Sequence, residues 1–263
     1  MILIKIGGGK TINLEGIISD LAEIQESCII VHGANALRDE LARLLGREKK
    51  VLESVSGYSS VLSDPPMIEL LMMAYAGLRN KRIVELCQKH GINAVGLSGL
   101  DGRLLQGKRN SGFRVRDGDK TKMVRDLSGK PCALNRDLLE YLISHHYTPV
   151  LSVPIIDETN TAINSENDDI VALIQREMRI PRILQFIEAP GFLEDPSAPS
   201  SLITRLSFSE LEHWEALSSG RIKRKLLAVK KLFAQEPVHV TIADGRIDHP
   251  LREALNGKGT DIR

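Results

Sequence analysis

The chain has 263 residues, of which 42% are hydrophobic and 26% are charged, as is typical of a soluble globular protein with one large or two modest domains. Its 35 lysines and arginines nearly balance its 34 aspartates and glutamates, which argues against a general binder of nucleic acids or membrane surfaces. Cys28, Cys87 and Cys132 are far apart and lack metal-ligand spacing, so they indicate core thiols, with neither a disulfide framework nor a metal site. No apolar stretch approaches membrane-spanning length and no basic leader is present, so we expect a cytoplasmic protein.

Short apolar runs alternate with longer segments of helical period, the pattern of βαβ units around a mainly parallel sheet. Strands are predicted at 2–6, 28–32, 94–97, 149–153, 183–187 and 238–242. Helices are predicted at 14–25, 36–45, 67–90, 135–145, 168–178, 209–217, 223–233 and 250–255. The sequence therefore predicts an α/β sandwich with a central, mainly parallel sheet.

The opening strand places Lys5 in an apolar run that leads directly into Gly7, Gly8 and Gly9. A lysine is rarely left in such a run without a partner, and glycines let backbone N–H groups approach an anion closely. A lysine reaching solvent before a flexible turn is the alternative. Three glycines exceed what a turn needs, so we favour a phosphate site.

The second strand ends at His32 and is followed by Gly33, Ala34 and Asn35 before a helix, whose N-terminus attracts negative charge. A plain turn with a helix cap is an equally good interpretation, and His32 fits a hydrogen-bonded structural role better than that of a base. The only Gly-Lys-Thr triplet, at 9–11, lacks the earlier glycine of a P-loop, which excludes a Walker ATPase. Neither a dinucleotide fingerprint nor a G-x-S-x-G elbow is present.

Three further segments carry unusual charge. Asn164 and Asp168 lie in an acidic stretch just before an apolar helix, which could also be an ordinary helix cap. Residues 220–225 open another helix with cations, the unfavourable end for the helix dipole, and this suggests an external anion. Residues 103–126 alternate polar and apolar side chains around glycines, as projecting antiparallel hairpins do, with eight basic against three acidic residues, a net +5.

Together these segments resemble the amino acid kinase family over nearly the whole chain. The similarity rests on IKIGGGK, IIVHGAN, GLRNKRIVELCQKHGINAVGLSGLDGRLLQGKR, DLSGK, INSENDD, GRIKRK, IADGRIDHP and GKGTDIR. The closest resemblance is to the carboxylate kinases of lysine and arginine biosynthesis whose acceptor is attached to a carrier protein. It implies a three-layer αβα sandwich with a projecting hairpin arm, an acceptor-binding lobe over 1–164 and an ATP-binding lobe over 165–263.

The resemblance also implies roles for individual residues. Lys5 and Lys225 would stabilise the transferred phosphoryl group of Mg²⁺-bound ATP, and Asp168 would orient both lysines. Residues expected to hold substrate or phosphates are Gly7, Gly8, Gly33, Ala34, Asn35, Val61 and Asn164, while Gly191 and Lys223 would contact the nucleotide. A carboxylate acceptor with a pKa near 4.3 is already ionised at neutral pH and needs no general base.

The implied acceptor is α-aminoadipate or glutamate held by a small acidic amino-group carrier, in an enzyme that is usually a homodimer. Arg114, Arg116 and Lys120 on the basic arm are the expected carrier-docking residues; a solvated basic hairpin is the alternative. A free N-acetylglutamate kinase and a non-catalytic regulatory member of the family are the alternative functions.

The chain departs from the family pattern at three positions. Ala34 stands where a glycine is usual, and Glu188 follows Ile187 where Ser or Thr precedes Asp or Asn. Val61 occupies the place of the arginine that binds the acceptor's α-carboxylate. Valine cannot form an ion pair, so we expect either a substitute cation, Arg38 or Arg79, or an acceptor without that contact.

Overall fold

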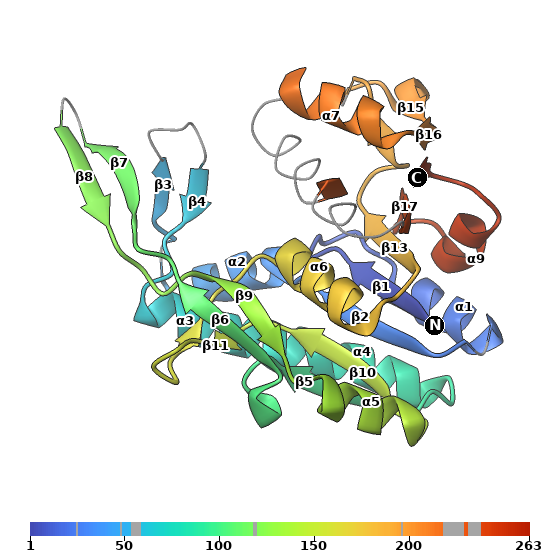
Figure 1. The fold of residues 1–263 in the computed structure, drawn as a ribbon, viewed down its shortest axis with the longest axis horizontal. Helices are drawn as coiled ribbons and strands as arrows, with labels where there is room; N and C mark the ends of the chain where they lie inside the picture. Colours follow the sequence, from blue (N-terminus) through green and yellow to red (C-terminus); the bar gives the residue numbers. More distant parts are fainter. Residues whose placement is uncertain are drawn as a thin grey trace.

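The computed structural model describes residues 1–24, 26–47, 49–53, 59–117, 120–195, 197–217, 229–230 and 238–263. Its helices are α1 (Leu14–Ile24), α2 (Asn35–Leu44), α3 (Pro65–Leu71), the π-helix η1 (Met72–Arg79), α4 (Asn80–Lys89), η2 (Asp101–Arg103), α5 (Arg136–Ser144), α6 (Asn167–Met178), η3 (Pro199–Ser201), α7 (Phe208–Leu217) and α9 (Pro250–Leu255). Figure 1 shows their arrangement around the strands.

An eight-stranded sheet forms the centre of the molecule, in the order β16-β18-β17-β13-β1-β2-β10-β5. Its strands are β1 (Ile2–Ile6), β2 (Cys28–His32), β5 (Ala94–Ser98), β10 (Thr148–Ser152), β13 (Arg182–Ile187), β16 (Arg205–Leu206), β17 (His239–Asp244) and β18 (Thr260–Ile262). All neighbouring strands are parallel except β17 and β18. This confirms the predicted mainly parallel sheet.

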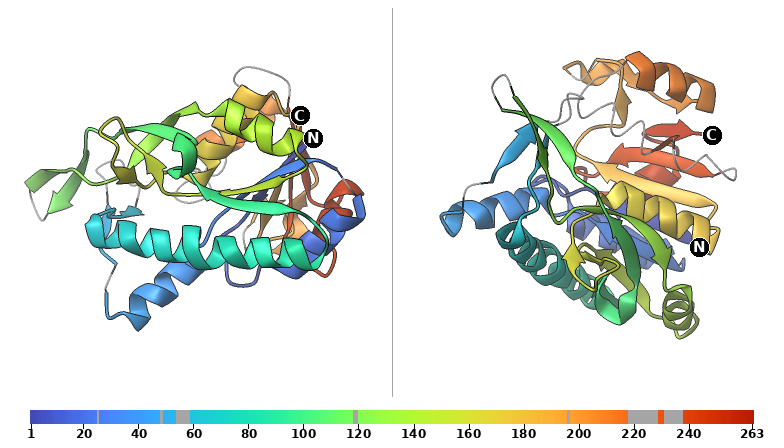
Figure 2. Two further views of the ribbon diagram at one scale, coloured as in Figure 1. Left: turned by 90° about the horizontal axis from the view of Figure 1, so that it is seen from below. Right: turned by 60° about the vertical axis from the view of Figure 1, so that its left-hand side comes forward.

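Helices cover both faces of this sheet, as the views in Figures 1 and 2 show. On one face, Ile2, Ile4 and Ile6 pack with apolar residues of α1, α4 and α9. On the other, Leu3 packs in a larger cluster with residues of α5 and α6. Because side chains alternate along a strand, Lys5 lies on the same face as Leu3, next to α6. The three layers thus fix which helix can reach the lysine.

A second, four-stranded sheet has the order β12-β11-β6-β9 and consists of β6 (Leu105–Arg109), β9 (Gly129–Leu134), β11 (Ile155–Ile156) and β12 (Ala162–Ile163). Three antiparallel pairs complete the strands: β3 (Val51–Glu53) with β4 (Ser59–Val61), β7 (Phe113–Asp117) with β8 (Lys120–Val124), and β14 (Phe192–Leu193) with β15 (Leu202–Ile203). The β7–β8 hairpin projects from the body beside β3–β4 (Figure 1).

Four predictions need correction or limits. The projecting arm is shorter than 103–126, because β6 pairs with β9 and β11 in the four-stranded sheet. Cys132 is exposed on β9, so only Cys28 and Cys87 are core thiols. The predicted helix at 67–90 forms one rod, seen in Figure 2, whose middle is the π-helix η1. Most of the predicted helix at 223–233 lies outside the described residues.

Candidate active site

Lys5 and Asp168 form an ion pair at the carboxyl end of the central strands. The Lys5 ammonium lies 2.8 Å from Asp168 Oδ1, and the two side chains are only 12% and 25% exposed. Asp168 lies in the first turn of α6, where the helix dipole favours a negative charge. The carboxylate therefore fixes the position of the ammonium while leaving its remaining N–H groups available.

Two small-residue loops interlock beside this pair. A Cβ atom on Gly8 would lie 2.6 Å from the backbone nitrogen of Asn35 and 2.7 Å from that of Ala34. A Cβ on Gly33 would lie 2.8 Å from the Gly8 nitrogen. Only glycine permits this approach of backbone to backbone. The loops after β1 and β2 thus bring backbone N–H groups together, as an anion-binding site requires.

Glu188 closes over the end of the first loop. Its carboxylate accepts hydrogen bonds from the backbone nitrogen and the hydroxyl of Thr11, at 2.8 Å and 2.7 Å. These bonds hold the pKa of the Glu188 carboxyl below its ordinary value. A Cβ on Gly9 would collide with this carboxylate. Sequence reasoning recorded Glu188 only as a departure from the family pattern and did not find this contact.

Ala34 and Asn35 differ in how they take part in the second loop. The Ala34 side chain is 1% exposed and belongs to the core, so only its backbone faces the loop. Asn35 begins α2, and its side-chain oxygen accepts a short hydrogen bond from the hydroxyl of Tyr75 in η1. Burial raises the pKa of Tyr75 to about 12, so this phenol remains a donor. No motif in the sequence indicates this hydrogen bond from η1.

His32 is a structural residue. The amide nitrogen of Asn80 donates to His32 Nε2 at 3.2 Å and to the Val150 carbonyl at 2.9 Å. Complete burial lowers the pKa of His32 to about 3, which keeps the ring neutral. This arrangement favours the structural interpretation of His32 over a role as a catalytic base.

Asn164 is linked through Ser63 to the base of the β7–β8 arm. Its side-chain nitrogen donates to the Ser63 hydroxyl at 3.1 Å, and the Ser63 backbone nitrogen donates to Asp126. Val61 is nearby in the chain, in β4, and packs against a small cluster of Ala42, Met67 and Leu70. The expected contact of Val61 with an acceptor stays a prediction.

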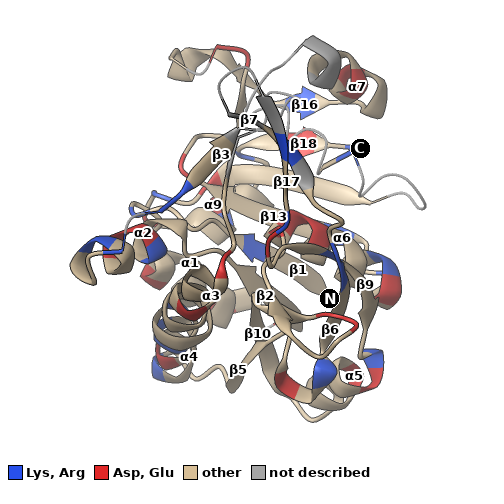
Figure 3. Ribbon diagram, turned by 90° about the vertical axis from the view of Figure 1, so that its left-hand side faces the viewer, with Lys and Arg blue, Asp and Glu red and all other residues tan. Residues whose placement is uncertain are grey.

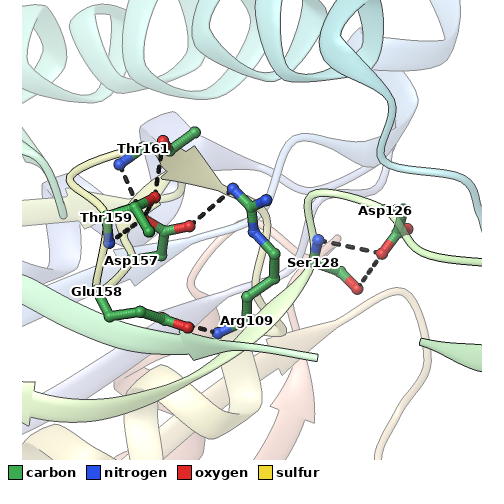
Figure 4. Close-up of polar contacts among 7 residues, drawn as sticks. All are labelled: Arg109, Asp126, Ser128, Asp157, Glu158, Thr159 and Thr161. Atoms are coloured by element: carbon green, nitrogen blue, oxygen red, sulfur yellow. Dashed lines mark hydrogen bonds and ion pairs between the residues drawn. The ribbon is translucent and has the colours of Figure 1, made fainter. Parts of the chain in front are cut away.

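A cavity of about 620 Å³ opens next to this network, lined by residues 62–65, 109–111, 124–127 and Glu158. Arg109 in its lining forms an ion pair with the buried Asp157 at 2.7 Å (Figure 4). Burial alone would raise the pKa of Asp157, but hydrogen bonds from Thr161 and Thr159, together with Arg109, hold it below its ordinary value. In the described part of the chain, Arg125 at the rim has no ion-pair partner.

The predicted carrier-docking residues lie on the β7–β8 hairpin. Arg114 is exposed on β7, while Arg116 and Lys120 belong to the paired strands, opposite Thr121 and Asp117. Figure 3 shows the molecule from the side on which the β3–β4 and β7–β8 hairpins project. The hairpin therefore presents at least Arg114 to an approaching partner.

The other predicted residues are placed as follows. Gly191 is buried, and a Cβ there would lie 2.6 Å from the Thr260 hydroxyl, so this glycine permits close packing on β18. Lys223 and Lys225 lie outside the described residues. Arg38, one of the two possible substitute cations, donates through Nε and Nη2 to Asp39. Its charge is therefore already paired.

Among the residues that the structure describes, no group of three or more His, Cys, Asp or Glu side chains could hold a metal ion. Over the same residues, the helices are too short or too polar to span a membrane.

Known proteins with similar sequences show which family has this arrangement of strands and loops. Residues 1–244 match the family model for the amino acid kinase family. The chain belongs to the amino acid kinase family. It is 36% identical to the [LysW]-aminoadipate kinase of Thermus thermophilus, with 100% of both chains covered, and 30% identical to the acetylglutamate kinase of Methanopyrus kandleri, also with 100% of both covered.

The fold agrees with that of a more distant amino acid kinase. A carbamate kinase from Giardia superposes with a TM-score of 0.68 at 12% identity, covering 99% of this chain and 97% of that one. This likeness concerns the fold alone. The match of residues 1–244 to the family model and the full-length relatives confirm the predicted resemblance to the amino acid kinase family.

Proposed function

We propose that the protein is an ATP-dependent kinase that phosphorylates the side-chain carboxylate of α-aminoadipate or glutamate carried on a small acidic carrier protein. The observation that carries this proposal is the Lys5–Asp168 pair beside two interlocked glycine loops. Full-length similarity to a [LysW]-aminoadipate kinase supports it. Residues 1–164 would bind the acceptor and residues 165–263 the nucleotide, with α6 packed against β1, β2 and β9 at the junction.

The reaction joins two anions, so its barrier is largely electrostatic. An oxygen of the ionised acceptor carboxylate attacks the γ-phosphorus, the bond to the β,γ-bridging oxygen breaks, and ADP leaves. Lys5 would stabilise the charge on the transferred group, and Asp168 holds that lysine in place. Lys225 is proposed to stabilise the same phosphoryl group.

The glycine loops fit the phosphates of ATP. The crowding around Gly8 and Gly33 leaves room for backbone N–H groups and excludes side chains. When bound, Mg²⁺ would enter with ATP and offset part of its negative charge. We place Gly7, Gly8, Gly33, Ala34 and Asn35 around the phosphates, and Gly191 and Lys223 near the nucleotide.

The cavity beside Asn164 favours a large acceptor. Its volume of about 620 Å³ is far more than an acetyl group needs and lies within the range of about 300–1,000 Å³ that is usual for ligand sites. Its acidic residues Asp64, Asp126 and Glu158 accept hydrogen bonds from backbone N–H groups, whereas Arg125 has no ion pair with another described residue. An acidic carrier segment fits this arrangement better than N-acetylglutamate does.

Trapping of the product tests the proposal. Hydroxylamine converts an acyl phosphate into a hydroxamate, which can be measured with Mg·ATP and each of three acceptors: α-aminoadipate on LysW, free N-acetyl-α-aminoadipate and free N-acetylglutamate. We expect hydroxamate from the LysW conjugate and little from the free compounds. Efficient use of N-acetylglutamate would favour the alternative kinase, and no product from any acceptor would favour a regulatory role. Light scattering would test the expected homodimer.

A further inference from the structure

The π-helix η1 contacts both glycine loops through two side chains one turn apart. Tyr75 donates its hydroxyl hydrogen bond to Asn35 in the second loop. Arg79 Nη2 makes a long hydrogen bond of 3.4 Å to the carbonyl of Gly7 in the first. Extended π-helix is rare, and π turns are frequently found at functional sites. The eight residues of η1 therefore place a guanidinium at the phosphate loops.

The charge of Arg79 is not neutralised by a neighbour. Its Nε is buried without a hydrogen-bond partner, and among the described residues no carboxylate lies within 4.0 Å of the guanidinium. The negative charge of Glu188 interacts with the Arg79 guanidinium at longer range, but the Glu188 carboxylate accepts its hydrogen bonds from Thr11. Arg38, by contrast, is paired with Asp39. A partly buried cation without a counterion costs free energy, so its position calls for an external anion.

We propose that Arg79 is a further phosphate-binding cation of this site, neutralised by the phosphates of bound ATP. The inference rests on the proposed kinase function. A guanidinium offers five N–H donors in a planar fork that matches phosphate oxygens, and only one of its nitrogens is used by Gly7. Arg79 would thus add to the charge that Lys5 supplies at the other side of the loops.

Equilibrium binding of Mg·ATP and thermal unfolding without nucleotide test this inference. The variants are Arg79→Met, Arg79→Lys and, as a matched control, Arg82→Met, which removes an exposed arginine from the same rod. We expect Arg79→Met to bind Mg·ATP about 10- to 150-fold more weakly, the loss of one charge-assisted hydrogen bond. Its unfolding temperature without nucleotide should equal or exceed that of the wild type. Arg79→Lys should recover part of the affinity, and Arg82→Met should bind normally.

A purely structural Arg79 would give the opposite result. Arg79→Met would then unfold at a lower temperature and keep its affinity for Mg·ATP, which would overturn the inference. Should Arg79→Met fail to fold, Arg79→Gln replaces it, and equal affinity of Arg79→Gln and wild type would overturn the inference in the same way. A wild type that binds no Mg·ATP would instead overturn the proposed function.

Discussion

The ammonium of Lys5 on the first strand lies 2.8 Å from the Asp168 carboxylate on α6, although most of the chain separates the two residues. Lys5→Met should mainly lower kcat, by about 10²–10³-fold, because this cation faces charge that develops in the transition state. Asp168→Asn should lower kcat as well, by releasing the lysine. The hydroxamate assay measures both. Lys89→Met, an exposed lysine paired with Glu15, is the control.

Near wild-type turnover in Lys5→Met would remove this lysine from the reaction. The same test applies to Lys225→Met, for which we expect a loss of similar size. Circular dichroism of each variant shows whether its fold is intact.

Gly8 and Gly9 should respond differently to alanine. In Gly8→Ala the new methyl group meets backbone atoms of Gly33, Ala34 and Asn35, which cannot move without opening the loops. In Gly9→Ala the three nearest atoms all belong to the end of the Glu188 side chain, which can rotate away. We expect Gly8→Ala to abolish ATP binding and Gly9→Ala to weaken it moderately. Calorimetric titration with Mg·ATP measures both.

A second substitution separates these two effects. Glu188→Ala should relieve the Gly9→Ala defect, because it removes the colliding atoms, but should not relieve Gly8→Ala. If Glu188→Ala restored ATP affinity equally to Gly9→Ala and to Gly8→Ala, or to neither, this account of the loop would be refuted.

The arm should act on the carrier and not on ATP. Changing Arg114, Arg116 and Lys120 together to Gln should raise KM for the LysW conjugate and leave KM for ATP nearly unchanged. The effect should shrink with added salt, since charge steering is screened over about 8 Å at physiological ionic strength. A triple change of Arg82, Lys89 and Arg136, which lie on helices of the body, is the control. An equal rise in KM in the control would indicate a general charge effect.

His32 should make folding sensitive to mild acid. Its pKa is lowered from an ordinary 6.5 to about 3 by burial, so between these values the unfolded chain binds a proton that the folded chain does not. The free energy of unfolding should therefore fall as pH decreases from 6.5, by at most about 1.4 kcal/mol per pH unit from this residue. Urea unfolding at pH 7, 6 and 5 measures it. His32→Asn should show a flatter slope; an unchanged slope would count against this assignment.

The central strands could be predicted well because their apolar runs end at glycine or polar turns. The predicted strands at 2–6 and 28–32 agree with β1 and β2 at both ends. The short strands were missed. The sequence of β18 lacks an apolar run, and the segment is a strand because it pairs with β17 and β16. Such pairing is set by distant residues and leaves no local pattern.

Site residues that lie in sequence motifs could be predicted, whereas contacts made from other segments could not. The resemblance implies that Asp168 orients Lys5, and the structure places the two side chains in contact, while their catalytic roles stay predictions. The contacts of Tyr75 and Arg79 with the loops were not predicted, although Arg79 had been considered as a cation. A helical period of 3.6 residues assigns faces wrongly across a π-helix, because each added residue rotates the following side chains.

The position of β1 between β2 and β13 has a consequence for synthesis of the chain. β1 is made before both of its neighbours and acquires the second one only when Arg182–Ile187 has been made. The Gly7 backbone nitrogen can then donate to its acceptor, the Phe186 carbonyl. Until that moment one edge of an almost wholly apolar strand is open to pairing with other chains. A shortened gene product that stops before β13 would therefore tend to aggregate, and the first glycine loop would be left without one of its anchors.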